Sequence, residues 1–289
     1  MTQALQSTPE SARPAQRRRL VVAIGLLIAP LLASCQTAPS PRSSASATSS
    51  PTALTVFTSG GFNAAFDTLA ASYRQTTGTP ITIAHGPSMG DTPNAIPARL
   101  GRREPADVVI LARSGLDKLA EAGLVEPDTA IDLGLSKIAV AVRAGAPLPD
   151  ISTPEALRAT LLKAKSVAWS DSASGVYIQS TMLDRLGIAD QVRPKGRMIP
   201  ATPVGQIVAN GQAEIGFQQL SELKPVKGIH IVGLLPASLQ KVTAFSGGVV
   251  AYSPHQAQAR ALLRYLSSPQ ADAAIRASGL EPAPRKAIP

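Results

Sequence analysis

Four short turns in this sequence gather small and hydroxyl-bearing residues where a strand-like run gives way to a helix-like pattern. They are Ser59-Gly60-Gly61, Gly86-Pro87-Ser88-Met89-Gly90, Ser172-Ala173-Ser174-Gly175 and Thr202-Pro203-Val204. The first turn of a helix carries free N–H groups and a partial positive charge, so it can hold an anion without Lys or Arg. For each turn taken singly, ordinary helix capping by Ser, Thr and Gly is the alternative.

Histidine is the other candidate for chemistry. His85 follows a predicted strand beside the second turn, where a general base could act, although a hydrogen-bonded loop histidine is the commoner explanation for such a residue. His230, inside a predicted strand, and His255, at a polar helix start, are interpreted as structural. The chain has no P-loop spacing and no HExxH, and its single cysteine excludes an internal disulfide and zinc sites built on several thiolates. We therefore expect no metal and no cofactor.

The elements that position these turns alternate between strand and helix. Apolar, β-prone runs at 54–58, 81–84 and 107–111 are separated by apolar residues at helical spacing, such as Phe62, Phe66, Leu69 and Tyr73. This order predicts a parallel sheet with helices on its faces. The alternation starts again at 138–142 and continues through strands at 166–169, 214–217 and 230–232, before a C-terminal helix at 258–266.

Extended links near 138–143 and 241–250 join the two halves of this pattern. We predict an α/β protein of two lobes, each a mainly parallel sheet flanked by helices, connected by two hinge crossovers. Lobe I comprises residues 53–137 plus 246–289, and lobe II comprises residues 138–245. Ligands of parallel α/β sheets lie outside the carboxyl ends of the strands, so the four turns are expected to meet in a cleft between the lobes.

The first fifty residues are expected to contain an export signal. Arg17, Arg18 and Arg19 precede a 14-residue apolar run, 20–33, which suits a signal peptide and is too short to span a bilayer. The run ends in Leu-Ala-Ser before Cys35, a pattern typical of lipoprotein signal peptides. We predict a signal peptide at 1–34, lipid attachment at Cys35, and a flexible Ser/Ala/Pro-rich tether at 35–52.

Composition narrows the function classes further. The chain has 289 residues, 44% of them apolar, which is enough for a sizeable core. Aromatic residues make up 3%, which argues against nucleic-acid modules that stack bases. The net charge of +9 falls to +6 beyond the predicted signal peptide and is spread without a basic run, so it indicates an anionic partner of no particular kind and helps to attract anions from a distance.

Several segments resemble the periplasmic molybdate-binding proteins, the solute-binding components of ABC importers. They are TSGGF at 58–62, GPSMG at 86–90, EPADVVI at 104–110, SDSASGVY at 170–177, PVGQIV at 203–208 and AEIGFQQ at 213–219. The resemblance covers about residues 53–282 and implies a type II periplasmic binding protein fold. It places oxyanion contacts at Ser88, Ser174 and Val204, whereas Gly61 and Gln219 stand where the family carries a serine and a tyrosine. GPSMG, IPARL, EPADVVI, SDSASGVY and IGFQQ also resemble a branch that contains aconitate isomerase.

Two functions stay open on these grounds, besides a sensor role. The first is an extracytoplasmic lipoprotein, anchored to a bacterial membrane as a monomer, that captures a molybdate-like oxyanion or small carboxylate for an ABC permease. The second is an isomerase that interconverts cis- and trans-aconitate by allylic proton transfer, with His85 as base and Arg99 and Arg197 as carboxylate clamps. The expected ligand-binding residues are Thr58, Ser59, Gly60, Gly61, Ser88, Met89, Ser172, Ser174, Gly175, Tyr177, Val204, Gln218 and Gln219.

Overall fold

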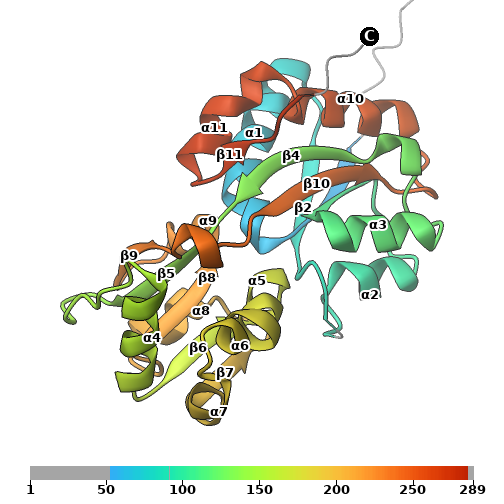
Figure 1. Ribbon diagram of the computed structural model, residues 1–289. Helices are drawn as coiled ribbons and strands as arrows, with labels where there is room; N and C mark the ends of the chain where they lie inside the picture. Colours follow the sequence, from blue (N-terminus) through green and yellow to red (C-terminus); the bar gives the residue numbers. More distant parts are fainter. Residues whose placement is uncertain (1–52, 91, 286–289) are drawn as a thin grey trace, which may run out of the picture. The chain divides into compact units, whose positions relative to one another are not determined.

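Two mixed sheets carry the fold in a computed structural model that describes residues 53–90 and 92–285 (Figure 1). The first sheet has the strand order β11-β4-β10-β3-β1-β2, and the second has the order β7-β6-β8-β5-β9. The first contains β1 (Leu54–Thr58), β2 (Ile81–His85), β3 (Val108–Ala112), β4 (Ile131–Ser136), β10 (Thr243–Val249) and β11 (Glu281–Pro282). The second contains β5 (Ile138–Arg143), β6 (Val167–Ser170), β7 (Gly196–Ile199), β8 (Ile215–Gln219) and β9 (Ile229–Leu234).

Helices cover both faces of each sheet. Those of the first sheet are α1 (Gly60–Thr77), α2 (Ile96–Gly101), α3 (Arg113–Glu121), η1 (Pro127–Thr129), α10 (Gln256–Leu266), η5 (Pro269–Ala271) and α11 (Asp272–Ala277). Those of the second are α4 (Pro154–Lys163), α5 (Ala173–Tyr177), the π-helical turn η2 (Ile178–Met182), α6 (Leu183–Arg185), α7 (Ala189–Val192), η3 (Arg193–Lys195), α8 (Val204–Ala209), α9 (Leu220–Leu223) and η4 (Ala237–Leu239). The predicted two-lobed α/β fold is thereby confirmed.

The parallel part of each sheet is smaller than predicted. β1 pairs in parallel with β2 and β3, and β6 pairs in parallel with β7 and β8. The remaining ladders are antiparallel, because β4, β5 and β10 run beside the places where the chain changes sheet. The strand β4 was not predicted from the sequence, because Asp132 and Gly134 lower the β propensity of this short run.

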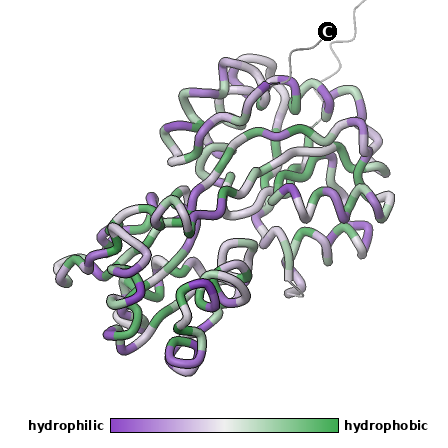
Figure 2. The backbone as a smooth tube through the Cα atoms, in the orientation of Figure 1, coloured by the Kyte–Doolittle hydropathy of each residue, from purple (hydrophilic) through white to green (hydrophobic). Residues whose placement is uncertain are grey.

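Buried side chains on the two faces of each strand form separate hydrophobic clusters. In the first sheet, Val108 and Ile110 pack toward α1, α10 and α11, whereas Val109 and Leu111 pack toward α2 and α3. This alternation explains why the five residues of β3 are all buried. Hydrophobic residues accordingly run along the central strands of both sheets in Figure 2.

Two short crossovers connect the sheets. Lys137 alone separates β4 from β5, and residues 235–242 return the chain from β9 to β10. The side chain of Gln240 holds the two crossovers together, because its Oε1 accepts from the Ile138 N–H at 2.8 Å and its Nε2 donates to the Ile138 carbonyl at 2.9 Å. β10 begins at Thr243, so the return to the first sheet comes before residue 246.

The export signal and tether predicted from the sequence lie outside the residues that the structure describes. This applies to the signal peptide at 1–34, to Cys35 and to the tether that ends at residue 52. Within residues 53–90 and 92–285, every helix is too short or too polar to traverse a bilayer.

Candidate functional site

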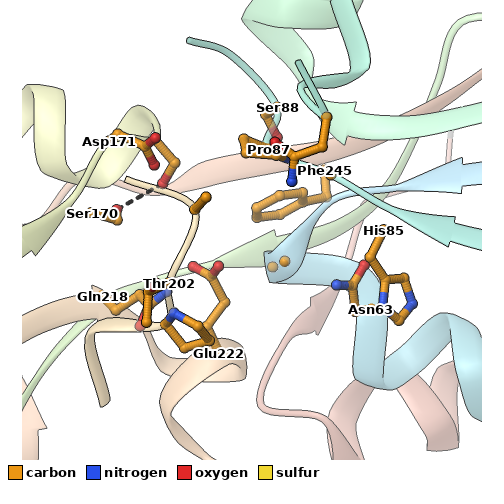
Figure 3. A pocket seen from close by; sticks show the side chains of 17 residues that line it. Asn63, His85, Pro87, Ser88, Ser170, Asp171, Thr202, Gln218, Glu222 and Phe245 are labelled. Carbon is orange, nitrogen blue, oxygen red and sulfur yellow. Dashed lines mark hydrogen bonds between the residues drawn. The ribbon is translucent and has the colours of Figure 1, made fainter. Parts of the chain in front are cut away.

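A pocket of about 280 Å³ lies where the carboxyl ends of β1, β2, β6 and β8 come together (Figure 3). Both sheets contribute to its wall. Its lining residues are Gly60, Gly61, Asn63, His85, Gly86, Pro87, Ser88, Asn94, Ser170, Asp171, Ser172, Ala201, Thr202, Pro203, Gln218, Glu222 and Phe245. The volume suits a small molecule, and carboxyl, hydroxyl and amide groups among the lining residues give it a polar wall.

The first turn, after β1, brings the start of α1 to the pocket. Ser59 is the N-cap in an extended conformation, and its buried hydroxyl oxygen has no hydrogen-bond partner among the described residues. Gly60 and Gly61 leave room for side chains from elsewhere in the chain. A Cβ on Gly61 would lie 2.0 Å from Cζ of Phe245, and a Cβ on Gly60 would lie 2.0 Å from Oε1 of Glu222.

Glu222, on the short helix α9, places a half-buried carboxyl group against the start of α1. Burial raises the pKa of Glu222 to about 7, the negative charge of Asp171 raises this pKa further, and the Gln218 amide and Gln219 backbone lower it. α9 is fixed to the first sheet's helices, since Ser221 Oγ donates to the Gly61 carbonyl at 2.7 Å and Lys224 Nζ donates to the Ala277 carbonyl at 2.7 Å. The carboxyl group is thus anchored and titrates near neutrality.

Gln218 is held in one orientation beside this carboxyl group. Its Oε1 accepts from the backbone N–H groups of Val204 at 2.9 Å and Gly205 at 3.4 Å, at the start of α8. The Gln218 Oε1 therefore occupies the N–H groups that the fourth turn was expected to offer to a ligand, while the amide nitrogen serves the Glu222 carboxyl group and lowers its pKa. The helix begins at Val204 with Pro203 as N-cap.

The third turn, after β6, carries the second carboxyl group of the pocket. Burial raises the pKa of Asp171, and hydrogen bonding to the Ala201 backbone lowers it. The hydroxyl of Ser170 bonds with those of Ser172 at 2.8 Å and Ser174 at 3.2 Å. Ala201 has a φ of 55°, in the left-handed region that non-glycine residues seldom adopt, so the backbone beside Asp171 is strained.

The second turn contributes a hydroxyl and an imidazole. Ser88 Oγ accepts from the Ala112 N–H at 3.0 Å, which leaves its hydrogen free to be donated into the pocket. His85 lines the pocket at the opposite side from Asp171, as Figure 3 shows, and its Nε2 lies 3.5 Å from Oδ1 of Asp67 on α1. Its side chain is 49% exposed, so water reaches the imidazole readily.

The structure brings some of the expected residues together and places others elsewhere. Gly60, Gly61, His85, Ser88, Ser172 and Gln218 line the pocket. Eight others lie outside its lining, namely Thr58, Ser59, Met89, Ser174, Gly175, Tyr177, Val204 and Gln219. Tyr177, for example, donates its hydroxyl to the Leu239 carbonyl at 2.8 Å.

Neither predicted arginine clamp lies in the pocket wall. Arg99 pairs with Glu104 at 2.7 Å and stacks 3.7 Å from the centre of the Phe57 ring. Arg197 donates to the Gln212 carbonyl at 2.7 Å. Among the residues that the structure describes, no lysine or arginine belongs to the pocket lining, so its donors to an anion are hydroxyl, amide and backbone groups.

Sequence reasoning missed the pocket's two acids, together with Asn63, Asn94 and Phe245. Asp171 immediately precedes the third turn, whose expected contacts were hydroxyl groups. Glu222 and Phe245 come from α9 and β10, which approach the pocket only because the chain crosses between the sheets. No local pattern in the sequence signals that approach.

The arrangement is suited to proton transfer. A carboxyl group that titrates near pH 7 beside a helix start can take a proton from carbon, while nearby N–H and hydroxyl donors stabilise the resulting negative charge. Separately, no group of three or more His, Cys, Asp or Glu side chains within residues 53–90 and 92–285 is placed to hold a metal ion.

Comparisons with known proteins agree with this fold. The sequence model of the bacterial extracellular solute-binding proteins matches residues 54–281. An aconitate isomerase from Pseudomonas sp is 54% identical over 233 residues, which cover 81% of this chain and 89% of that protein. The periplasmic molybdate-binding protein of Azotobacter vinelandii has a TM-score of 0.62 at 22% identity and covers 80% of this chain and 100% of its own. The sulfate-binding protein of Mycobacterium tuberculosis has a TM-score of 0.60 at 19% identity and covers 80% of this chain and 87% of its own.

The matched region contains both sheets, except Pro282 at the end of β11, and every residue that lines the pocket. Two structures of oxyanion-binding proteins share the fold, and the sequence relative at 54% identity extends over most of both chains. This chain belongs to the bacterial extracellular solute-binding proteins.

Proposed function

We propose that this protein is an aconitate isomerase, with Glu222 as its general base. The observation that carries the proposal is the position of the Glu222 carboxyl group, inside the pocket, with a pKa of about 7. At neutral pH such a group exists in both protonation states, which allows it to take up and return a proton within one catalytic cycle. The 54% identity to an aconitate isomerase supports the same reaction.

The reaction shifts a proton between two carbons of an allylic system. Glu222 takes a proton from the methylene carbon, the electron pair of that C–H bond forms a new double bond to the central carbon, and the vinyl carbon receives a proton. Negative charge that spreads onto a substrate carboxylate during the shift is stabilised by the hydroxyl groups of Ser88 and Ser172 and by backbone N–H groups at the start of α1. His85, half-exposed, is less suited to hold a proton away from water.

Purified protein mixed with cis-aconitate tests this function, with the trans isomer followed by proton nuclear magnetic resonance. We expect interconversion in both directions, and a loss of about 10²–10⁴-fold in kcat for Glu222→Gln. Glu121→Gln is the matched control, because Glu121 is an exposed residue at the end of α3, far from the pocket lining. Absence of isomerisation by the unaltered protein would overturn the proposal.

Capture of an oxyanion for an ABC importer is the second candidate. The free hydroxyl hydrogen of Ser88 and the fold shared with molybdate- and sulfate-binding proteins favour it. The two carboxyl groups repel either anion when they are ionised, so their charge does not separate the candidates, whereas only the isomerase uses a group that accepts and returns a proton. Calorimetric titration with molybdate, tungstate, sulfate, citrate and both aconitates separates the candidates: binding of molybdate without any tricarboxylate favours import.

Under either function we propose that the mature protein works outside the cytoplasm, held to a membrane by lipid on Cys35. The basic n-region, the short apolar run and the Leu-Ala-Ser-Cys sequence support this anchoring. For the importer function we also propose that the protein is a monomer and binds an ABC permease. The isomerase function needs no partner beyond its small anionic substrate.

A further inference from the structure

Three side chains with ionisable groups line the pocket, namely His85, Asp171 and Glu222. The proposed reaction needs two proton-transfer events, one at each of two carbon atoms that flank the central carbon. A single side chain can perform both proton transfers only if it carries the proton from one carbon to the other. If a second side chain in the same pocket serves the other carbon, no side chain has to move the proton between them.

Asp171 and Glu222 are held at separate places on the wall. A Cβ on Gly60 would lie 2.0 Å from Glu222 Oε1, whereas a Cβ on Gly90 would lie 3.8 Å from Asp171 Oδ2. One carboxyl group therefore faces the turn after β1 and the other faces the turn after β2. The charge of Asp171 nonetheless raises the pKa of Glu222, so the two groups interact across the pocket.

Asp171 also has the support that a proton donor needs. It comes from the turn after β6, and the backbone of Ala201, left-handed with φ at 55°, hydrogen-bonds to its carboxyl group and so fixes its position, while lowering its pKa by less than burial raises it. Burial raises the pKa of Asp171, which favours the protonated form required of a donor. His85 differs, since its Nε2 faces Asp67 and its side chain is half exposed.

We propose that Asp171 and Glu222 divide the reaction between them, each serving one of the two carbon atoms. This inference rests on the proposed isomerase function. In one direction Glu222 accepts the proton of the methylene C–H bond, the double bond moves to the central carbon, and Asp171 gives its proton to the former vinyl carbon. In the other direction Asp171 accepts and Glu222 gives. Each turnover exchanges the protonation states of the two carboxyl groups, so protons and electrons balance, and proton exchange with water resets both groups before the next turnover in the same direction.

Deuterium exchange in D₂O tests this division with the variants Glu222→Gln and Asp171→Asn. We expect neither variant to interconvert the aconitates at more than about a hundredth of the normal rate. Each is expected to exchange methylene hydrogen for deuterium in one isomer only, and the two variants in opposite isomers. Asp190→Asn, on an exposed position of α7, is the matched control.

Calorimetric binding of propane-1,2,3-tricarboxylate, which has three carboxylates and no double bond, shows whether each variant still folds around a ligand. Where binding is retained, normal isomerisation by the Asp171→Asn variant would overturn the division. So would a variant with one remaining carboxyl group that exchanges the methylene hydrogen of both isomers. The division would also be overturned if His85→Ala, and not Asp171→Asn, showed exchange in one isomer only. If the unaltered protein fails to interconvert the isomers, the proposed function fails instead.

Discussion

The Glu222 carboxyl group occupies the space that a side chain at position 60 would need, because a Cβ on Gly60 would come within 2.0 Å of Glu222 Oε1. Gly60 begins α1 beside the first sheet, and Glu222 follows β8 of the second. The glycine is therefore a requirement set by a residue from the other half of the fold. It lets an acidic side chain approach the positive end of an 18-residue helix.

Replacing Gly60 by Ala should displace the carboxyl group with little effect on folding. The Cβ meets the far end of a flexible side chain, which can rotate away, so the free energy of unfolding should change by less than about 1 kcal/mol. A base moved by about 1 Å loses on the order of 10²-fold in kcat/KM. Gly101→Ala is the control, since nothing lies within 4 Å of a Cβ there. Normal turnover by Gly60→Ala would show that Glu222 is not the base.

The pH dependence of isomerisation should follow the ionisation of Glu222. Because burial raises its pKa to about 7, the group is mostly protonated, and unable to accept a proton, at pH 5. We expect kcat/KM to fall about tenfold per pH unit below pH 6 and to level off above pH 8 on its rising limb. Initial rates from pH 5 to 9 measure this, and a rising limb centred near pH 4 would point to an ordinary exposed carboxyl group.

Glu222 should also make the protein less stable as the pH rises. Its pKa is higher in the folded protein, at about 7, than the value of about 4.3 in an unfolded chain, so folding favours the protonated form. The stability that this provides is complete below pH 4 and is lost as the pH increases through 7. Urea unfolding should find Glu222→Gln more stable than the unaltered protein by on the order of 2–3 kcal/mol at pH 8.5, and about equal at pH 4. Equal stability at both values would contradict the raised pKa.

The fold was predictable because its signals are local. Phe62, Phe66, Leu69 and Tyr73 repeat at helical spacing, and all four are buried on α1. β3 is a continuous apolar run because both of its faces are covered. β4 was missed, since its short sequence makes sense only beside β10, which pairs with it more than a hundred residues later in the chain.

The pocket was predictable only in outline. Strand-to-helix turns identified Ser88 and Ser172, because the carboxyl ends of parallel strands share one edge. Gln218 entered through the resemblance, and its actual role, closing the start of α8, depends on a contact between distant segments. Glu222 has no local signature, since its pKa and its position arise from burial against another sheet's helix.

Cys35→Ala should release the mature protein from the membrane. Lipid attachment at this only cysteine is the anchor that the sequence predicts, so its loss should shift the protein from the membrane pellet to the soluble extract of the cell envelope. Detergent phase partitioning and mass spectrometry of the amino-terminal residue measure the change. Cys35→Ala protein that remains membrane-bound would contradict the anchor, whatever its effect on isomerisation.

Serine at position 61, where the molybdate-binding family carries one, should be incompatible with Phe245. A Cβ on Gly61 would lie 2.0–2.7 Å from atoms of the Phe245 ring, and this buried ring packs within the core of the first sheet. We expect Gly61→Ser to lower the free energy of unfolding by about 1–3 kcal/mol through overpacking.

Phe245→Leu alone should also destabilise the protein, because it leaves unfilled space. The double variant should be more stable than the two losses added together predict, by about 0.5–3 kcal/mol. Additive losses in urea unfolding would show that the two positions do not contact each other, and the absence of serine at position 61 would then need another cause.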